Sequence, residues 1–160
     1  MKSKKWIIAI NLVLFLGYFL YSIKDKENIL TQGEKILLKL APVDPRSLLQ
    51  GDYMNLNYEM NNVVRKIENE GKYLVISKDE SDVGMFKRIQ MGTEPLADNE
   101  YLIKFKRGER NTIRIGAESF FFQEGKAELY EAAKYGSLRI DNKGNSVLEG
   151  LYSEDFILLE

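Results

Sequence analysis

Residues 51–60 read GDYMNLNYEM, a tight turn followed by strict alternation of side chains. From Tyr53 onward the spacing predicts a β-strand, because successive side chains of a strand point to opposite faces. One face carries Met54, Leu56, Tyr58 and Met60, and the other carries Tyr53, Asn55, Asn57 and Glu59. We predict that the first face packs inward, and that the polar face is either solvated or receives a partner.

The segment before this strand is rich in turn residues. Asp44 can cap a helix, Pro45 suits the first helical position, and residues 47–50 can form about one turn before Gly51 ends it. A tight connection bracketed by Asp44 and Asp52 is therefore expected ahead of the strand.

Further short runs of alternating polarity predict antiparallel strands. In residues 34–41 the pattern sends Ile36, Leu38 and Leu40 to one face. Three hairpins are expected, pairing residues 72–77 with 85–90, 101–106 with 111–116, and 136–141 with 146–152. Short helices are expected at residues 126–136 and 61–71, ending at Gly136 and Gly71. The fold class is thus mainly β (α+β), an antiparallel β-rich domain with one or two short helices.

Residues 6–23, WIIAINLVLFLGYFLYSI, are apolar on every helical face and predict a membrane-spanning helix. Such a helix is roughly 27 Å long, close to a hydrocarbon core of about 30 Å. Trp6 at one end and Tyr18 and Tyr21 near the other fit interfacial aromatics. A cleaved signal peptide is the alternative, but LGYFLYSIKDK lacks the small residues of a cleavage site, so we expect a retained anchor.

The charges beside this helix predict its orientation. Lysines at positions 2, 4 and 5 precede it, whereas the lysines at 24 and 26 are offset by acids at 25 and 27. The positive-inside rule then puts the N-terminus in the cytoplasm and the C-terminal domain in the periplasm or outside the cell. We divide the chain into a cytoplasmic stub and anchor (1–23), a stalk (24–33) and a β-rich domain (34–160).

Composition excludes several kinds of chemistry. The chain contains neither cysteine nor histidine, so disulfides, thiolate nucleophiles, sulfur-ligated metals and histidine acid–base catalysis are ruled out. The whole-chain net charge is −1 and three lysines precede the anchor, which leaves −4 on residues 24–160 and argues against a nucleic-acid partner. No cofactor is expected. Residues 25–36 and 141–150 do not match a calcium loop, so no metal site is predicted.

The run GDYMNLNY at residues 51–58 resembles the motif of the membrane-anchored GDYXXLXY proteins. The resemblance continues through LLKLAPVDPRSLLQGDYM upstream, and through GAESFFFQEGKAELYE and GSLRIDNKGNSVLEGLY downstream. The FFFQEG version is similar to that of Bacteroidetes-type members. The resemblance implies an N-terminal span, a β-rich exported domain, no established activity, and a multispan membrane protein as partner.

The family pattern points to Asp44, Pro45, Arg46, Gly51, Asp52, Tyr53, Leu56, Tyr58, Glu118, Glu124 and Gly125. Many of these residues are explained by a structural role alone. Asp44, Pro45 and Gly51 suit turns, and Leu56 and Tyr58 suit the core. The neighbouring residues 120–122 suggest a strand buried on both faces. Our hypothesis is that Arg46, Asp52, Glu118 and Glu124 converge into a polar cluster, which is either a binding site or a structural ion-pair network.

Two classes of function follow. The first is a non-enzymatic binding or accessory module for the multispan partner or an envelope ligand. Its candidate binding residues are Asp44, Arg46, Asp52, Tyr53, Asn55, Asn57, Tyr58, Glu118 and Glu124. The alternative is an envelope hydrolase that uses the carboxylates of Asp52 and Glu118, or Ser47 with a lysine in a signal-peptidase-like arrangement. We favour the binding module because the usual catalytic side chains are missing.

Overall fold

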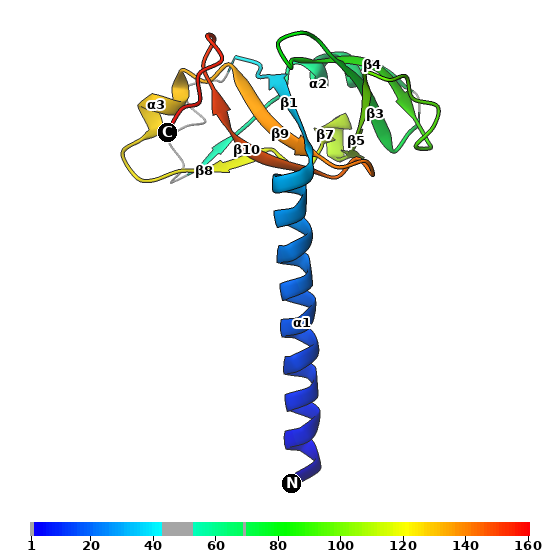
Figure 1. Ribbon diagram of the computed structural model, residues 1–160, viewed down its shortest axis with the longest axis vertical. Helices are drawn as coiled ribbons and strands as arrows, with labels where there is room; N and C mark the ends of the chain where they lie inside the picture. The colour runs from blue at the N-terminus through cyan, green and yellow to red at the C-terminus, as the bar shows by residue number, and fades with distance from the viewer. Residues whose placement is uncertain (1, 43–52, 69) are drawn as a thin grey trace.

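The computed structural model describes residues 2–42, 53–68 and 70–160, which form one long helix and a β-rich head (Figure 1). Helix α1, Lys2–Gln32, is 31 residues long. Its side chains are exposed from Lys4 to Asn28. By length and composition this helix is able to span a bilayer. The predicted α+β fold class is confirmed.

Helix α1 joins the head through a close-packed junction. The segment expected to form a stalk continues α1 up to Gln32. Ile29 in its last turn is buried against strands β9 (Tyr135–Ile140) and β10 (Ser146–Tyr152). Gly33 then turns the chain directly into strand β1. A Cβ at Gly33 would lie 2.4 Å from the carbonyl oxygen of Ile29, which is closer than packed atoms approach, so this position requires glycine.

The strands within the described residues form two three-stranded and two two-stranded antiparallel sheets. The first has the order β1-β9-β10, and the second has the order β4-β3-β5. The smaller sheets pair β2 with β8 and β6 with β7. The bounds are β1 Glu34–Lys39, β2 Tyr53–Asn55, β3 Tyr73–Lys78, β4 Gly84–Gln90, β5 Glu100–Lys104, β6 Lys106–Arg107, β7 Ile113–Arg114, β8 Ser119–Phe121, β9 Tyr135–Ile140 and β10 Ser146–Tyr152. The short helices are α2 Met60–Val64, the 3₁₀ helix η2 Glu109–Asn111 and α3 Ala127–Glu131.

One apolar core joins these sheets. Ile36 and Leu38 from β1, Leu74 and Ile76 from β3 and Leu138 from β9 are nearly inaccessible to solvent. The inward face predicted for residues 54–58 is confirmed, because Met54, Leu56 and Tyr58 are buried in the same cluster. Outward residues at 53, 55, 57 and 59 are exposed, as the alternation predicts. The polar face is thus held in place by its apolar counterpart.

Two of the predicted hairpins are confirmed, β3 with β4 and β9 with β10. The third is wrong in part. Strand β5 pairs with β3, and a short ladder of β6 with β7 joins residues 106–107 to 113–114. Leu102 and Ile103 are buried. Burial of these side chains in the core therefore favours pairing of β5 with β3, the central strand of its sheet, over pairing with the segment that follows β5 in the chain.

Three other predictions need correction. Helix α3 ends at Glu131 and α2 ends at Val64, so neither reaches the glycine expected to cap it. Gly136 instead lies in β9 under the ring of Tyr58, where a Cβ would be 3.2 Å from a ring carbon. The predicted strand at residues 120–122 is not buried on both faces, because Phe121 is 74% exposed. Pairing and packing across the chain outweigh local propensity at these sites.

Tyr58 gives a test of this core. Its hydroxyl donates a hydrogen bond to the carbonyl oxygen of Ala117. Tyr58→Phe leaves that carbonyl without its donor, and we expect a loss of about 1–3 kcal/mol in the free energy of unfolding. The measurement is urea unfolding of the full chain in detergent, followed by the circular dichroism of the head. Tyr53→Phe, at an exposed position, is the matched control; equal midpoints for the two variants would contradict the assignment.

Candidate functional site

A groove of about 510 Å³ runs beside the outward face of β2. Its lining includes Tyr53, Asn55 and Asn57, together with Glu118 and Ser119 at the start of β8. The β2–β8 ladder sets Asn55 opposite Ser119, which brings these two segments together. The polar face predicted for residues 53–57 therefore forms one wall of a groove.

Glu118 acts as an acceptor for backbone amides. Its carboxylate accepts hydrogen bonds from the amide N–H of Ile115 and, at 3.1 and 3.2 Å, from that of Gly116. Gly116 has a φ of +84°, a left-handed conformation that glycine adopts without strain. The backbone carbonyl of Glu118 also accepts a hydrogen bond from the Leu56 N–H, at 2.6 Å. Glu118 thus folds the turn before β8 and fixes the groove wall.

Tyr58 lies behind the groove, on the buried face of the same segment. Burial raises the pKa of its phenol well above the usual range, and the negative charge of Glu118 adds to the effect. The hydroxyl therefore remains protonated and serves as a hydrogen-bond donor to Ala117. As predicted, Tyr58 is a core residue, and its outward neighbours line the groove.

The opposite part of the groove is basic and was not found from the sequence. Arg65, just after α2, and Arg114, on β7, both line it and are exposed. Among the described residues, no carboxylate lies within ion-pair distance of either guanidinium. The alternation of residues 111–116 could have indicated an outward Arg114, but its place in the groove beside β2 depends on packing between distant segments.

Asn61 adds a further polar group to the groove. It is 3% exposed, and its amide nitrogen donates to the Asn57 side-chain oxygen at 3.3 Å. Its own side-chain oxygen has no hydrogen-bond partner among the described residues. A buried acceptor without a donor is costly, so this atom favours a ligand or solvent donor in the groove.

The other predicted site residues fare differently. Glu124 is exposed in the segment after β8 and does not line the groove. Asp44, Arg46 and Asp52 lie outside the described residues. The four-residue polar cluster therefore stays a prediction, as does the carboxylate pair of Asp52 and Glu118. Tyr53, Asn55, Asn57 and Glu118 are the predicted residues that the structure brings together.

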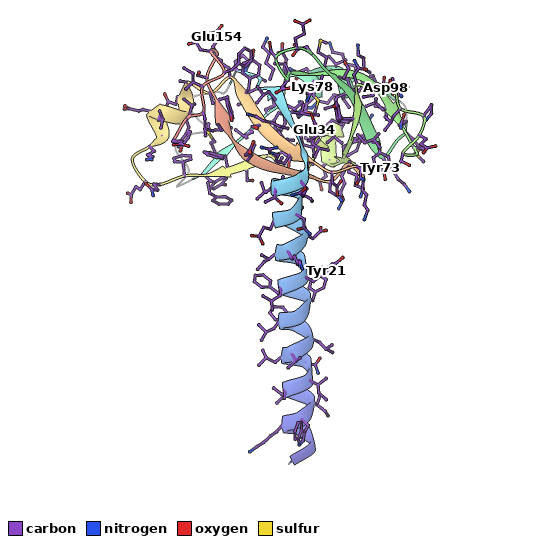
Figure 2. All side chains as sticks on the ribbon, in the orientation of Figure 1. Tyr21, Glu34, Tyr73, Lys78, Asp98 and Glu154 are labelled. Atoms are coloured by element: carbon purple, nitrogen blue, oxygen red, sulfur yellow. The ribbon has the colours of Figure 1, made fainter. Side chains whose placement is uncertain are left out.

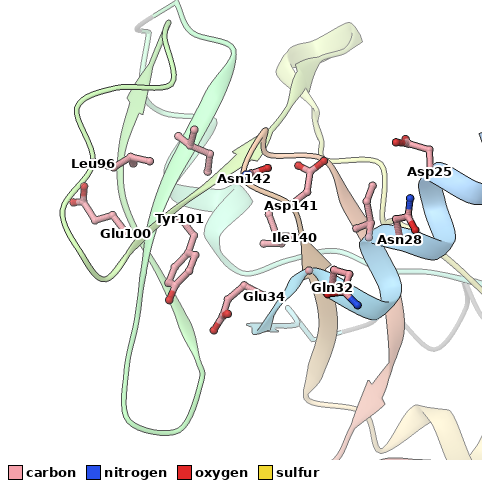
Figure 3. Close-up of a pocket in the computed structure, with 13 residues that line it drawn as sticks. Asp25, Asn28, Gln32, Glu34, Leu96, Glu100, Tyr101, Ile140, Asp141 and Asn142 are labelled. Atoms are coloured by element: carbon pink, nitrogen blue, oxygen red, sulfur yellow. The ribbon is translucent and has the colours of Figure 1, made fainter.

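A second groove, of about 520 Å³, lies between α1 and the head. Figure 3 shows Asp25, Asn28 and Gln32 of α1 on one side, and Leu96, Glu100 and Tyr101 on the other. Most of its acids are engaged within the fold. Glu34, which Figure 2 shows in the head above α1, pairs with Lys78. Arg88 binds Glu100 at 2.6 Å and lowers the pKa of that carboxyl.

Asp141 in the same groove accepts hydrogen bonds from Asn145 and the Lys143 amide. Across the part of the chain that the structure describes, no three acidic side chains gather in a way that could hold a metal ion. Glu34, Glu100 and Asp141 therefore hold strands and a turn of the head together, and the groove at β2 is the stronger candidate site.

An apolar N-terminal helix, long enough to span a bilayer and joined to a β-rich head, defines the class of this small protein. Residues 15–151 match the model of the GDYXXLXY protein family, and the chain belongs to that family. The resemblance to this family is thereby confirmed, and the similarity to Bacteroidetes-type members stays a prediction. Comparison with curated proteins and with solved structures finds no match for the chain.

Glu118→Gln tests the structural role of that carboxylate. The substitution removes the charge that receives the Ile115 and Gly116 amides, so we expect a loss of about 1–3 kcal/mol in unfolding free energy. Glu124→Gln, on the exposed segment after β8, is the control and should change stability by less than about 0.5 kcal/mol. Urea midpoints of the full chain measure both. A Glu118→Gln protein as stable as the control would show that these hydrogen bonds do not hold the turn.

Proposed function

We propose that this protein is a single-pass membrane protein whose head lies on the extracytoplasmic side and binds a membrane partner there. The groove beside β2 is the binding site, and no reaction is catalysed. The observation that carries the proposal is the pairing, in one groove, of an outward polar strand with the two exposed guanidinium groups of Arg65 and Arg114.

The anchor is supported by the character of α1. An apolar helix that exposed Ile7, Leu14 and Phe15 in water would be unfavourable, and a bilayer removes that exposure. Lysines precede the apolar run at its N-terminal end, and the segment after it is balanced in charge. This asymmetry supports a cytoplasmic N-terminus and an extracytoplasmic head.

The lining chemistry supports a ligand that carries a carboxylate. Guanidinium groups bind carboxylates through paired N–H donors, and two such groups face the same groove. The Asn61 side-chain oxygen, which has no hydrogen-bond partner among the described residues, suits a backbone N–H, and the side chains of Asn55 and Asn57 offer further donors and acceptors. An acidic, extended peptide segment, such as a loop of a multispan membrane protein, fits these requirements.

A binding role agrees with the state of Glu118. Its carboxylate accepts hydrogen bonds from two backbone amides and holds the turn before β8, so the structure gives this group a role within the fold. The chain also lacks histidine and cysteine, the side chains that most often act as bases and nucleophiles.

The membrane topology is tested with single cysteines, because the natural chain contains none. Glu154→Cys, at an exposed position of the head, should react with an impermeant maleimide in intact spheroplasts. Lys4→Cys, ahead of the apolar run, should react only after lysis. Labelling of Lys4→Cys in intact spheroplasts, or a mature chain shortened by signal cleavage, would contradict the proposal.

The groove is tested by photocrosslinking from position 57 in intact cells. We expect capture of an integral membrane protein through a segment containing Asp or Glu, whereas the same probe at Lys87 on β4 should not capture it. Reversing both charges, Arg65→Glu with Arg114→Glu, should weaken binding by at least about a hundredfold and lower the crosslinking yield accordingly, because charged hydrogen bonds contribute about 1.5–3 kcal/mol each. Lys87→Glu is the matched charge control; equal yields from the two proteins would contradict the groove assignment.

A further inference from the structure

We propose that the head rests directly on the lipid headgroup layer, through an exposed aromatic pair formed by Tyr53 and Phe121. This inference rests on the membrane anchor of the proposed function. It adds a lipid-contacting surface on the head itself, separate from the spanning helix.

The position of the head along α1 sets its height above the bilayer. The apolar run of α1 ends at Ile23, and Lys26 already lines a cleft with Gly116 and Ser119 of the head. Three helical residues correspond to a rise of about 4.5 Å. The polar layer on each side of the hydrocarbon is roughly 5–8 Å thick. The beginning of β8 therefore lies at the depth of the lipid headgroups when α1 spans the membrane.

Strand β8 lies along the margin of the head from which α1 emerges (Figure 1). Its residues alternate: Phe120 points into the core and packs against Tyr130, with ring centroids 4.9 Å apart. Phe121 points outward and is 74% exposed. Its cross-strand partner on β2 is Tyr53, which is 38% exposed, and their ring centroids are 5.7 Å apart.

An exposed phenylalanine next to a tyrosine suits the membrane interface. Aromatic rings are enriched there because an apolar ring meets acyl chains while a hydroxyl reaches the headgroups. Tyr21, near the end of the apolar run of α1, is a further aromatic residue expected at this membrane interface (Figure 2). Insertion of the Phe121 ring would remove most of its exposed apolar surface from water, a favourable change.

The junction gives the head little freedom to leave this depth. Ile29 is buried against the head, and Gly33 fits too closely against Ile29 and Ile140 for any side chain. The head is thus carried at a fixed height by α1. Whenever α1 spans a membrane, the lipid surface lies next to β8 and is the partner that contacts it. Glu124 is exposed close after Phe121, so we expect contact to depend on apolar insertion and not on anionic lipid.

Fluorescence quenching by brominated lipid tests the contact. Trp6 is the single tryptophan of the chain, so the background variant is Trp6→Phe. Into it we place one tryptophan at a time in the full chain: Phe121→Trp for the pair, Leu14→Trp for the spanning helix, and Val63→Trp on α2 as an exposed head position. The proteins are held in phosphatidylcholine nanodiscs made with unbrominated lipid, with lipid brominated near the headgroup, or with lipid brominated near the end of the acyl chains.

We expect headgroup-brominated lipid to quench Phe121→Trp, chain-end-brominated lipid to quench Leu14→Trp, and neither lipid to quench Val63→Trp. The emission of Phe121→Trp should also be blue-shifted relative to that of Val63→Trp. Quenching at Leu14 with none at Phe121 overturns the lipid contact and leaves the anchor intact. Absence of quenching at Leu14 overturns the anchor of the proposed function, and the contact with it. Equal quenching at Phe121 and Val63 overturns the assignment to this margin of the head.

Discussion

The buried phenol of Tyr58 fixes the segment on which the site depends. Its ring lies over Gly136 of β9, and its hydroxyl binds the Ala117 carbonyl just ahead of β8. Because side chains alternate along residues 53–58, holding position 58 inward also holds positions 53, 55 and 57 outward. A shift by one residue would bury the asparagines and expose the core face. One hydrogen bond and one close aromatic contact therefore set which side of the chain meets a ligand.

The groove and the lipid-contacting pair meet at Tyr53. This residue lines the groove and also packs against Phe121. A ligand in the groove would therefore lie next to the bilayer surface, where the loops of an integral membrane protein are found. The arginines at 65 and 114 line the same groove and are suited to acidic groups. The two proposals describe one surface with an apolar margin and a charged interior.

Much of this architecture could be predicted from the sequence because it depends on local patterns. The apolar run of α1, the alternation at residues 53–58 and the two hairpins can each be recognised within one continuous stretch of sequence. Three features depend on contacts between distant segments and could not be predicted in this way. Strand β5 joins β3, Gly136 accommodates Tyr58 in place of capping a helix, and Phe121 is exposed. Arg65 and Arg114 were missed for the same reason, since only tertiary packing brings them to the strand of Tyr53.

The glycine junction has a mechanical consequence for the assembled membrane. With Ile29 seated in the head and Gly33 leaving no room for a swivel, the helix and the head turn as one body. If a neighbouring transmembrane helix packs against one face of α1, that contact fixes the rotation of the head about the membrane normal. It therefore also fixes the direction, parallel to the membrane, in which the groove opens. Packing between helices inside the bilayer would in this way determine the orientation of the groove outside the bilayer.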